Sequence, residues 1–298
     1  KPTVIYIHGW QKGSSAAQNR ETFNRKDAGG PDLDLAYAWR AAGYNVGIMY
    51  WNQFADEGEV KDAEAKIWSA TATRAMRWKN VAGVYSTGPT QSVTDLLFTS
   101  YKDNLAGYTG SNIRILGHSL GNQVAINLTK KISDAVSAGT INSKLLPKRV
   151  ALLDPFYSQN AKSYLGNKWT GEVCRTYVSA LKTKGVIFEA YRTSLASSSG
   201  FVGDANTDLM KMTAFTELKT GYFNQTQQTQ KHNAAVWHYL WSFTYNAPVI
   251  TGTTNQAASA KTSDARINTI MGGTKKLVHD RGTSTKEPWD DTFLEAAR

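Results

Sequence analysis

The pentapeptide Gly117-His118-Ser119-Leu120-Gly121 constrains this chain more than any other feature of its 298 residues. It follows an apolar run, Ile113 to Leu116, that is typical of a buried strand, and it precedes a helix-compatible run, Asn122 to Lys131. Glycines two positions before and two after the serine leave room for a sharp strand-to-helix turn, known as a nucleophile elbow. Such a turn lifts a serine hydroxyl out of the sheet and directs helix N–H groups toward an incoming anion. The pattern therefore predicts that Ser119 is a nucleophile.

A serine nucleophile also needs backbone donors for the oxyanion of its tetrahedral intermediate. Val4 to Ile7 is a β-branched and aromatic run that predicts a buried strand, and His8-Gly9-Trp10 follows it directly. Because glycine lets the backbone approach a substrate oxygen closely, a His-Gly step in this position is typical of an oxyanion loop. We expect the N–H groups of Trp10 and Leu120 to form the oxyanion hole and His8 to orient the loop.

The carboxylate that orients the base has two candidates. Asp154 directly follows the apolar strand Val150 to Leu153 and precedes Pro155, which ends the strand. The carboxyl ends of parallel strands open on one side of a sheet, so Asp154 is expected to face the same crevice as Ser119. Asp204 lies in a glycine- and serine-rich loop after a later strand, and its order along the chain does not exclude it.

Three histidines follow the first of these acids, and they differ in their surroundings. His232 follows a polar loop and opens an aromatic, helix-compatible segment, so its ring can turn onto a serine at the mouth of a crevice. His238 falls within the apolar run and is typical of a core histidine. His279 lies near Lys275 and Lys276, which is typical of a solvated surface residue. The pattern favours His232 as the base.

The organisation of the chain follows from the alternation of strand-like and helix-like segments, which predicts a mainly parallel central sheet with helices on both faces. Residues 1–250 are predicted to form the catalytic domain. Residues 251–298 are rich in Thr, Ser, Asn, Gly and charged residues and are predicted to be a polar C-terminal tail packed on the same domain. The segment 195–231 lies between acid and base, where we predict a lid; an ordinary surface loop is the alternative.

Composition excludes several classes of function. Lys and Arg number 34 against 24 acidic residues, which gives a net charge of +10 at pH 7. The basic residues are scattered and form no RNA-binding signature, so no nucleic-acid partner is expected. No apolar run approaches the length of a membrane span. No Cys/His metal spacing, phosphate loop or dinucleotide fingerprint is present, and we expect neither a cofactor nor a metal.

The residues that carry a resemblance to a known family lie in five stretches: Val4 to Trp10, Tyr44 to Trp51, Ile113 to Val124, Arg149 to Phe156 and, more weakly, His232 to Tyr239. They resemble the pancreatic-lipase-like branch of the α/β-hydrolases, which includes lipases and phospholipases A1. The resemblance implies an α/β-hydrolase fold. In that branch the acid stands in a Leu-Asp-Pro context and the base precedes an aromatic helix, which favours Asp154 and His232.

The resemblance also implies a function. We expect a secreted serine lipase or carboxylesterase that hydrolyses fatty-acyl esters of lipids, with a lipid–water interface as its place of action. A phospholipase A1, a small-ester esterase and a non-catalytic lipid-binding protein of the same fold are the alternatives. Animal members of the branch are rich in disulfides and often carry a C-terminal β-sandwich, whereas this chain has Cys174 alone and a short polar C-terminal region. These departures favour a distant microbial relative.

Overall fold

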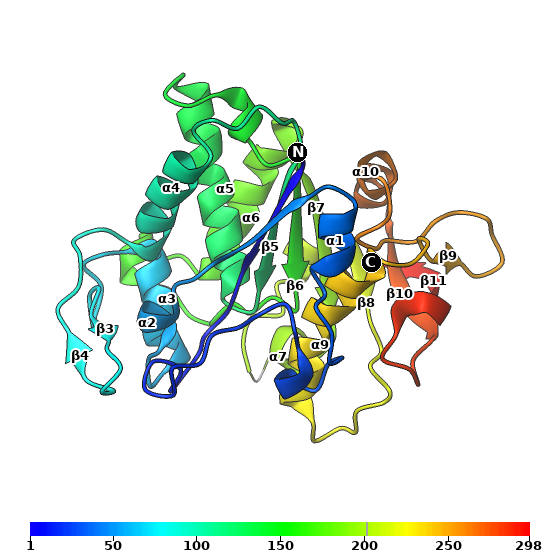
Figure 1. Cartoon of the computed structure of the whole chain (residues 1–298), viewed down its shortest axis with the longest axis horizontal. Helices are drawn as coiled ribbons and strands as arrows, with labels where there is room; N and C mark the ends of the chain where they lie inside the picture. Colours follow the sequence, from blue (N-terminus) through cyan, green and yellow to red (C-terminus); the bar gives the residue numbers. More distant parts are fainter. Residues whose placement is uncertain (201) are drawn as a thin grey trace.

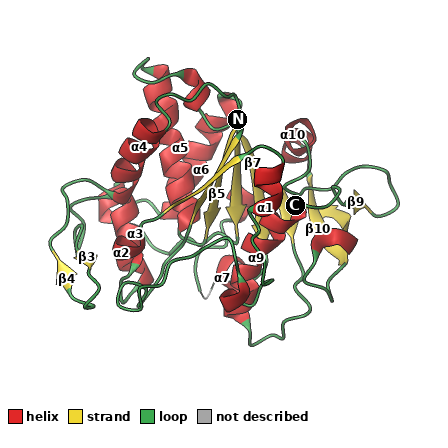
Figure 2. Ribbon diagram, viewed as in Figure 1, coloured by secondary structure: helices red, strands yellow, loops and turns green. Residues whose placement is uncertain are grey.

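The computed structural model describes residues 1–200 and 202–298. Within them the chain builds a nine-stranded sheet (Figures 1 and 2). The six neighbouring pairs from β2 to β10 are parallel, and β11 runs antiparallel to β10. In order across the sheet, the strands are β2 (Asn45–Met49), β1 (Thr3–Ile7), β5 (Ile113–His118), β6 (Arg149–Leu153), β7 (Ile187–Arg192), β8 (Ala214–Glu217), β10 (Lys275–Arg281), β11 (Thr292–Ala297) and β9 (Val249–Ile250).

Helices cover both faces of this sheet (Figure 2). One face carries α4 (Val93–Asn104), α5 (Gly121–Ser137) and α6 (Thr170–Thr183), and the other carries α1 (Tyr37–Ala41), α9 (Gln228–Ser242) and α10 (Asp264–Gly272). Every residue of β1, β5 and β6 is buried, because a parallel strand covered on two sides presents both sets of side chains to the core. The predicted mainly parallel sheet with helices on both faces, the α/β-hydrolase fold, is confirmed.

The region between β2 and β5 holds an insertion. It contains α2 (Asn52–Ala55), α3 (Val60–Trp68) and the hairpin of β3 (Trp78–Lys79) with β4 (Tyr85–Ser86). The helical spacing of apolar residues from Val60 predicts α3, whereas nothing in the sequence predicts the short hairpin. A capping box then starts α4, in which the Ser92 hydroxyl accepts a hydrogen bond from the Asp95 N–H at 3.2 Å.

The predicted lid segment, 195–231, contains part of the sheet. It includes α7 (Leu195–Ser198), α8 (Thr207–Lys211) and β8, which pairs with β7 and β10. β8 therefore belongs to the main sheet. One residue of the segment, Phe201, lies outside the described residues. Movement of the parts on either side of β8 stays a prediction.

The C-terminal region is more ordered than its composition indicates. After α10 it forms β10 and β11, and β10 joins the main sheet through β8. Leu277 and Phe293 are almost completely buried, while the residues beside them face outward. Because side chains of a strand alternate between two faces, the buried residues of these strands are separated by outward-facing ones, and the segment looks like a tail when its composition is averaged.

Buried ionic contacts tie this region to the centre of the sheet. Arg149 of β6 is fully buried, and its Nε lies 2.6 Å from Glu189 of β7. Its remaining N–H groups donate to the carbonyl oxygens of Ser259 and Thr262, each at 2.7 Å. A buried guanidinium is tolerated only when its charge is paired and its donors are used, so these contacts fix the position of residues 259–262 against the sheet.

The remaining described elements are short 3-10 turns: η1 (Lys26–Ala28), η2 (Ser143–Leu145), η3 (Ser163–Leu165) and η4 (Pro288–Asp290). None of the helices in residues 1–200 and 202–298 combines the length and the apolar character of a membrane span.

Candidate active site

The turn at Ser119 has the geometry of a nucleophile elbow. It joins the end of β5 to the start of α5, and Ser119 has a φ of 55°, a left-handed conformation that is strained for a residue with a side chain. A Cβ on Gly117 would lie 2.5 Å from the Gly121 oxygen, and one on Gly121 would lie 2.3 Å from the Ile7 oxygen. Both glycines are therefore required by close packing of the turn against β1 and α5.

The loop after β1 lies against Ser119. A Cβ on Gly9 would come within 2.6 Å of the Ser119 Cβ and 3.2 Å of its Oγ, so only glycine lets the loop approach the hydroxyl this closely. The buried His8 ring stacks on Trp51 and accepts a hydrogen bond from the Trp51 N–H at 3.0 Å. Burial lowers the pKa of His8, which keeps the ring neutral. The structure agrees with the expectation that His8 orients the loop.

The two expected oxyanion donors flank the serine. Within the described part of the chain, neither the Trp10 N–H nor the Leu120 N–H has a hydrogen-bond acceptor. The Trp10 indole donates to the Glu57 oxygen at 2.8 Å, which anchors the end of the loop. Both N–H groups are thus available for a substrate oxygen.

Asp154 and His232 are in direct contact. The His232 Nδ1 lies 2.6 Å from Asp154 Oδ2, although 77 residues separate the two in the sequence. Asp154 is fully buried directly after β6 and has a φ of 41°. His232 lies in the second turn of α9 and its side chain is 19% exposed, so one edge of the ring faces solvent while the other is held by the carboxylate.

Asp154 accepts four further hydrogen bonds from the start of the β7–α7 loop and α7. They come from the N–H groups of Thr193 at 2.7 Å and Ser194 at 3.2 Å, from the Ser197 hydroxyl at 2.6 Å, and from the Ser194 hydroxyl. Burial opposes ionisation of Asp154, but the bonds from His232, Ser194 and Ser197 outweigh it and lower its pKa. The carboxylate is therefore ionised at neutral pH.

Sequence reasoning missed Ser194 and Ser197 as partners of the acid. Ser194 also lies 3.5 Å from His232 Nδ1, so it contacts both members of the pair. A signal existed for Ser194, because it stands two residues after β7, which neighbours β6 in a parallel sheet, and side chains after the strand ends gather on one edge of such a sheet. Ser197 lies further on, within α7, and carried no such signal.

His118, the second residue of the pentapeptide, contacts α9, the helix that carries His232. Its Nε2 donates to the His232 carbonyl oxygen at 3.0 Å, and the two rings lie 4.5 Å apart between centroids. Burial and the neighbouring His232 lower the pKa of His118 to about 3. A neutral His118 thus holds the backbone of His232 beside the elbow.

Ser119 and His232 are not hydrogen-bonded to each other in the described structure. They are brought to one place by shared neighbours: the Ser119 N–H donates to the oxygen of Leu153, next to Asp154, and His118 contacts His232. In enzymes without substrate, catalytic hydrogen bonds are often long and shorten only when substrate binds.

The alternative acid and bases lie elsewhere. Asp204 accepts a hydrogen bond from the Asn206 N–H at 2.8 Å and lies against Gly171 of α6. His238 is a buried core residue 2.8 Å from the Tyr222 hydroxyl, as expected, and burial lowers its pKa to about 4. The expectation of a surface position for His279 is wrong, because its side chain falls on the inward face of β10, 2.8 Å from the buried Asp291.

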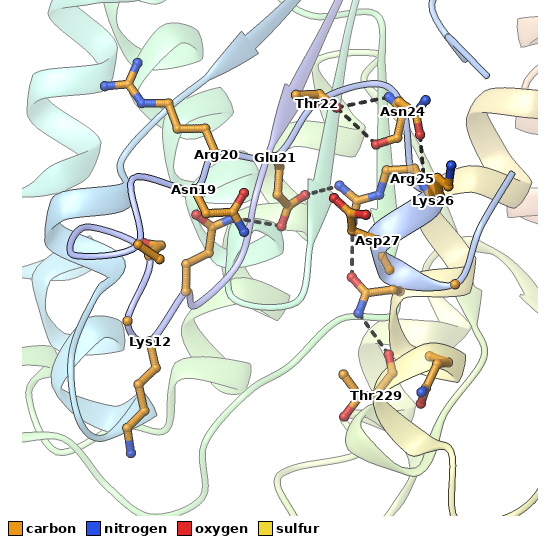
Figure 3. Close-up of a pocket in the computed structure, with 18 residues that line it drawn as sticks. Lys12, Asn19, Arg20, Glu21, Thr22, Asn24, Arg25, Lys26, Asp27 and Thr229 are labelled. Carbon is orange, nitrogen blue, oxygen red and sulfur yellow. Dashed lines mark hydrogen bonds and ion pairs between the residues drawn. The ribbon is translucent and has the colours of Figure 1, made fainter. Parts of the chain in front are cut away.

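Two open cavities are lined by residues close to His232 in the sequence; the walls of the larger are mainly polar, whereas Leu195 and Leu218 contribute to the walls of the other. The larger, about 780 Å³, lies between the loop after β1 and the start of α9 (Figure 3). The other, about 590 Å³, lies between the β7–α7 loop and the residues before His232. No aromatic side chain is among the described residues that line either one. Across residues 1–200 and 202–298, no three His, Cys, Asp or Glu side chains are grouped so that they could hold a metal ion.

No protein-family model matches this sequence, and a comparison with curated proteins finds no match. Solved structures show similarity in fold. An extracellular α/β-hydrolase from a Paenibacillus species has a TM-score of 0.35 and 12% identity, over 73% of this chain and 89% of that one. Phospholipase PlaB from Legionella pneumophila, in complex with thio-NAD, has a TM-score of 0.30 and 12% identity, over 72% of this chain and 41% of its own.

A third similar structure is ClbQ from the colibactin NRPS/PKS pathway, with a TM-score of 0.25 and 13% identity over 56% of this chain and 54% of that chain. Identities and TM-scores of this size do not carry a function from one protein to another. The α/β-hydrolase fold of this chain follows from its own sheet order and from the elbow after β5.

Proposed function

We propose that this protein is a serine hydrolase that cleaves carboxylic ester bonds. The observation that carries the proposal is the 2.6 Å contact between His232 Nδ1 and the buried Asp154, beside a serine in a strained elbow. A histidine held by an ionised carboxylate can activate a nearby serine hydroxyl for acyl transfer once the two come within hydrogen-bond distance.

The residues have distinct roles in the proposed reaction. Ser119 Oγ attacks the ester carbonyl carbon while His232 Nε2 takes the hydroxyl proton. Asp154 holds the imidazole in the tautomer with a proton on Nδ1 and stabilises the imidazolium that forms. The N–H groups of Trp10 and Leu120 donate to the oxyanion, a contribution of about 3 kcal/mol for each donor.

Two half-reactions complete the cycle. When the tetrahedral intermediate collapses, the C–O bond to the alcohol breaks and His232 Nε2 delivers its proton to the departing oxygen. Water then attacks the acyl-enzyme and gives a proton to His232. The bond between the acyl carbon and Ser119 Oγ breaks, Oγ takes that proton back from His232, and the carboxylic acid leaves.

The class of ester is a finer part of the proposal. Hydrolysis of fatty-acyl lipid esters by a secreted enzyme stays a prediction from the resemblance. Neither cavity near His232 is lined by an aromatic side chain of the described residues, which favours the small-ester alternative, because a long acyl chain gains binding energy from apolar surroundings. A series of p-nitrophenyl esters from acetate to palmitate separates the two: a maximum at short chains supports the small-ester esterase.

Hydrolysis of p-nitrophenyl butyrate tests the proposed chemistry. Ser119→Ala and His232→Ala are each expected to lower kcat by at least about 10⁴-fold, as loss of one member does in enzymes of this kind. Ser137→Ala, an exposed change at the far end of α5, is the matched control and should leave kcat unchanged. Retention of more than a tenth of the activity in folded Ser119→Ala protein would overturn the assignment of Ser119 as the nucleophile.

A further inference from the structure

The larger cavity beside the proposed site, which we call the polar cavity, has walls from three segments of the chain. These are the loop at residues 11–17, the loop at residues 19–29, and the first two turns of α9 (Figure 3). Its volume is about 780 Å³, within the range of pockets that hold small molecules.

The wall of the polar cavity contains sequence neighbours of two residues of the proposed site. Gln11 in its wall follows Trp10, an expected oxyanion donor, and Asn233 follows His232. Arg25 NH2 donates to Asn233 Oδ1 at 3.1 Å, so the loop wall and the helix wall are joined next to the proposed base. A part of the substrate bound in this cavity would therefore lie near a carbonyl group placed over Ser119.

A buried ion pair forms the floor of the polar cavity. Arg25 NH1 lies 2.5 Å from Glu21 Oε2, and the same carboxylate accepts hydrogen bonds from the Tyr6 hydroxyl at 2.6 Å and from Gln11 Nε2 at 2.8 Å. Burial opposes ionisation of Glu21, but the charge of Arg25 and the hydrogen bond from Tyr6 help to outweigh it, and the pKa of Glu21 is lowered. The pair is therefore charged on both sides and neutral as a whole.

Several polar groups in these walls are unused. Arg25 is only 4% exposed and its Nε has no partner among the described residues; the same holds for the Ser14 hydroxyl, at 9% exposure. The side chains of Asn19 and Thr229 are exposed and make no hydrogen bond to another described residue, so they can contact a bound molecule. Buried polar groups are nearly always hydrogen-bonded in proteins, so the Arg25 Nε and the Ser14 hydroxyl point to a polar ligand.

The mixture of groups selects the kind of ligand. Amides and hydroxyls in the walls offer donors and acceptors together, and a ligand hydroxyl both donates and accepts. A phosphate or carboxylate would meet the cations of Lys12, Arg20 and Lys26 as well as the carboxylates of Glu21 and Asp27. It offers acceptors alone, so it would leave the amide and hydroxyl acceptors of the wall without a donor. An alkyl chain would leave the polar walls without partners, at a cost in free energy.

We propose that the polar cavity binds the alcohol part of the ester, and that this part is an uncharged, hydroxyl-rich group such as a sugar or another polyol. The inference rests on the proposed function, because the departing alcohol takes its proton from His232 and so leaves on the α9 side of Ser119. The cavity lies on that side, with Thr229, Gln230 and Asn233 of α9 in its wall.

Esters that share one acyl group and differ in the alcohol test this assignment. The substrates are 6-O-butyryl-glucose, glycerol monobutyrate, butyryl-glycerol 3-phosphate and hexyl butyrate. We expect kcat/KM for the glucose and glycerol esters to exceed that for the hexyl ester by tenfold or more, and the phosphate ester to be a poorer substrate than the glycerol ester. Equal rates for all four, or preference for the hexyl or phosphate ester, would overturn the inference.

A double variant assigns the preference to this cavity. Asn19→Leu with Thr229→Val removes two unused polar side chains with little change in volume, and it should reduce the preference for the glucose ester over the hexyl ester from tenfold or more to below threefold. Asn255→Leu with Thr99→Val makes the same chemical changes at exposed positions far from the site and should keep the preference. A preference unchanged in the first variant would contradict the assignment.

Binding separates this inference from the proposed chemistry. In Ser119→Ala protein, calorimetric titration with 6-O-butyryl-glucose should show binding that the Asn19→Leu and Thr229→Val changes weaken by fivefold or more. Absence of binding overturns the polar cavity as a polyol site even if p-nitrophenyl butyrate is hydrolysed by the unmodified protein. Binding in a protein that cleaves no ester supports the cavity and overturns the proposed function alone.

Discussion

Asp154 is a buried charge that depends on its hydrogen-bond donors. Among the described residues, His232, Thr193, Ser194 and Ser197 together supply five donor groups to the carboxylate. A carboxylate in this setting fixes the tautomer of the histidine and stabilises its charged form during turnover. Removing the charge of Asp154 should therefore slow the reaction even where the size and shape of the site stay the same.

Asp154→Asn tests this role at constant size. The amide lacks the negative charge and favours the wrong tautomer of His232, so we expect kcat for p-nitrophenyl butyrate to fall by about 10⁴-fold. Circular dichroism should show a folded protein. The free energy of unfolding should fall by about 1–3 kcal/mol, because the N–H₂ group of the new amide side chain would face the hydrogen-bond donors that now contact Asp154. Asp204→Asn is the matched control; if it abolishes activity while Asp154→Asn does not, Asp204 is the acid.

At the scale of elements, the turn between α2 and α3 holds the loop after β1. Asp56 accepts hydrogen bonds from the N–H groups of Gly13 and Ser15, and the Glu57 oxygen accepts the Trp10 indole. The Glu57 carboxylate is itself fully buried and pairs with Lys66 of α3 at 2.6 Å and with Arg77 at 2.5 Å. This ionic cluster joins the insertion to the loop that carries an expected oxyanion donor.

Glu57→Gln should lower the free energy of unfolding and change how that free energy depends on pH. Burial opposes ionisation of Glu57, but the bonds from Arg77 and Lys66 lower its pKa to about 2, from an ordinary value of 4.5. A lowered pKa stabilises the fold fully above pH 4.5, and that contribution is lost as pH falls from 4.5 to 2. The variant should therefore lose less stability than the unmodified protein across this range.

At pH 7 the same variant leaves the Lys66 charge buried without its partner. We expect the free energy of unfolding, measured by urea titration, to fall by about 3–5 kcal/mol. Asp62→Asn in the same helix, which breaks a half-exposed pair with Arg74, is the control and should cost less than about 1 kcal/mol. Equal losses for the two variants at pH 7 would show that the Glu57 cluster does not stabilise the insertion.

Local patterns predicted the elements that carry the site. Glycine spacing identified the elbow, and apolar runs identified β1, β5 and β6, because each of these signals depends on a few neighbouring residues. The hydrogen bonds from Ser194 and Ser197 to Asp154 could not be predicted from such signals. They depend on how β7 lies next to β6, and that pairing joins residues about 40 positions apart.

At the scale of the whole molecule, the sheet extends into the C-terminal region. Arg149 bonds to the oxygens of Ser259 and Thr262, and His279 on β10 lies against Asp291, which is also near His238 of α9. The helix that carries His232 therefore packs against the last strands. Averaged composition indicated a polar tail here because buried charges and strand alternation hide a core from a count of polar residues.

Two adjacent substitutions in β11 test whether this region belongs to the core. Phe293 is 2% exposed and stacks on His279, whereas Leu294 is 44% exposed. Phe293→Ala should lower the free energy of unfolding by about 3–5 kcal/mol, and Leu294→Ala should change it by less than about 1 kcal/mol. The measurement is urea unfolding followed by tryptophan fluorescence; similar small losses for both would show a peripheral tail.

The central claim is that Ser119 is a nucleophile activated by His232. Reaction with a fluorophosphonate probe, followed by mass mapping of the adduct, tests it most directly, because the probe reacts with activated serines and remains bound. We predict one adduct per chain, located on Ser119, with labelling at least 100-fold slower in His232→Ala protein. An adduct on another serine, or no adduct in folded protein, would contradict the account.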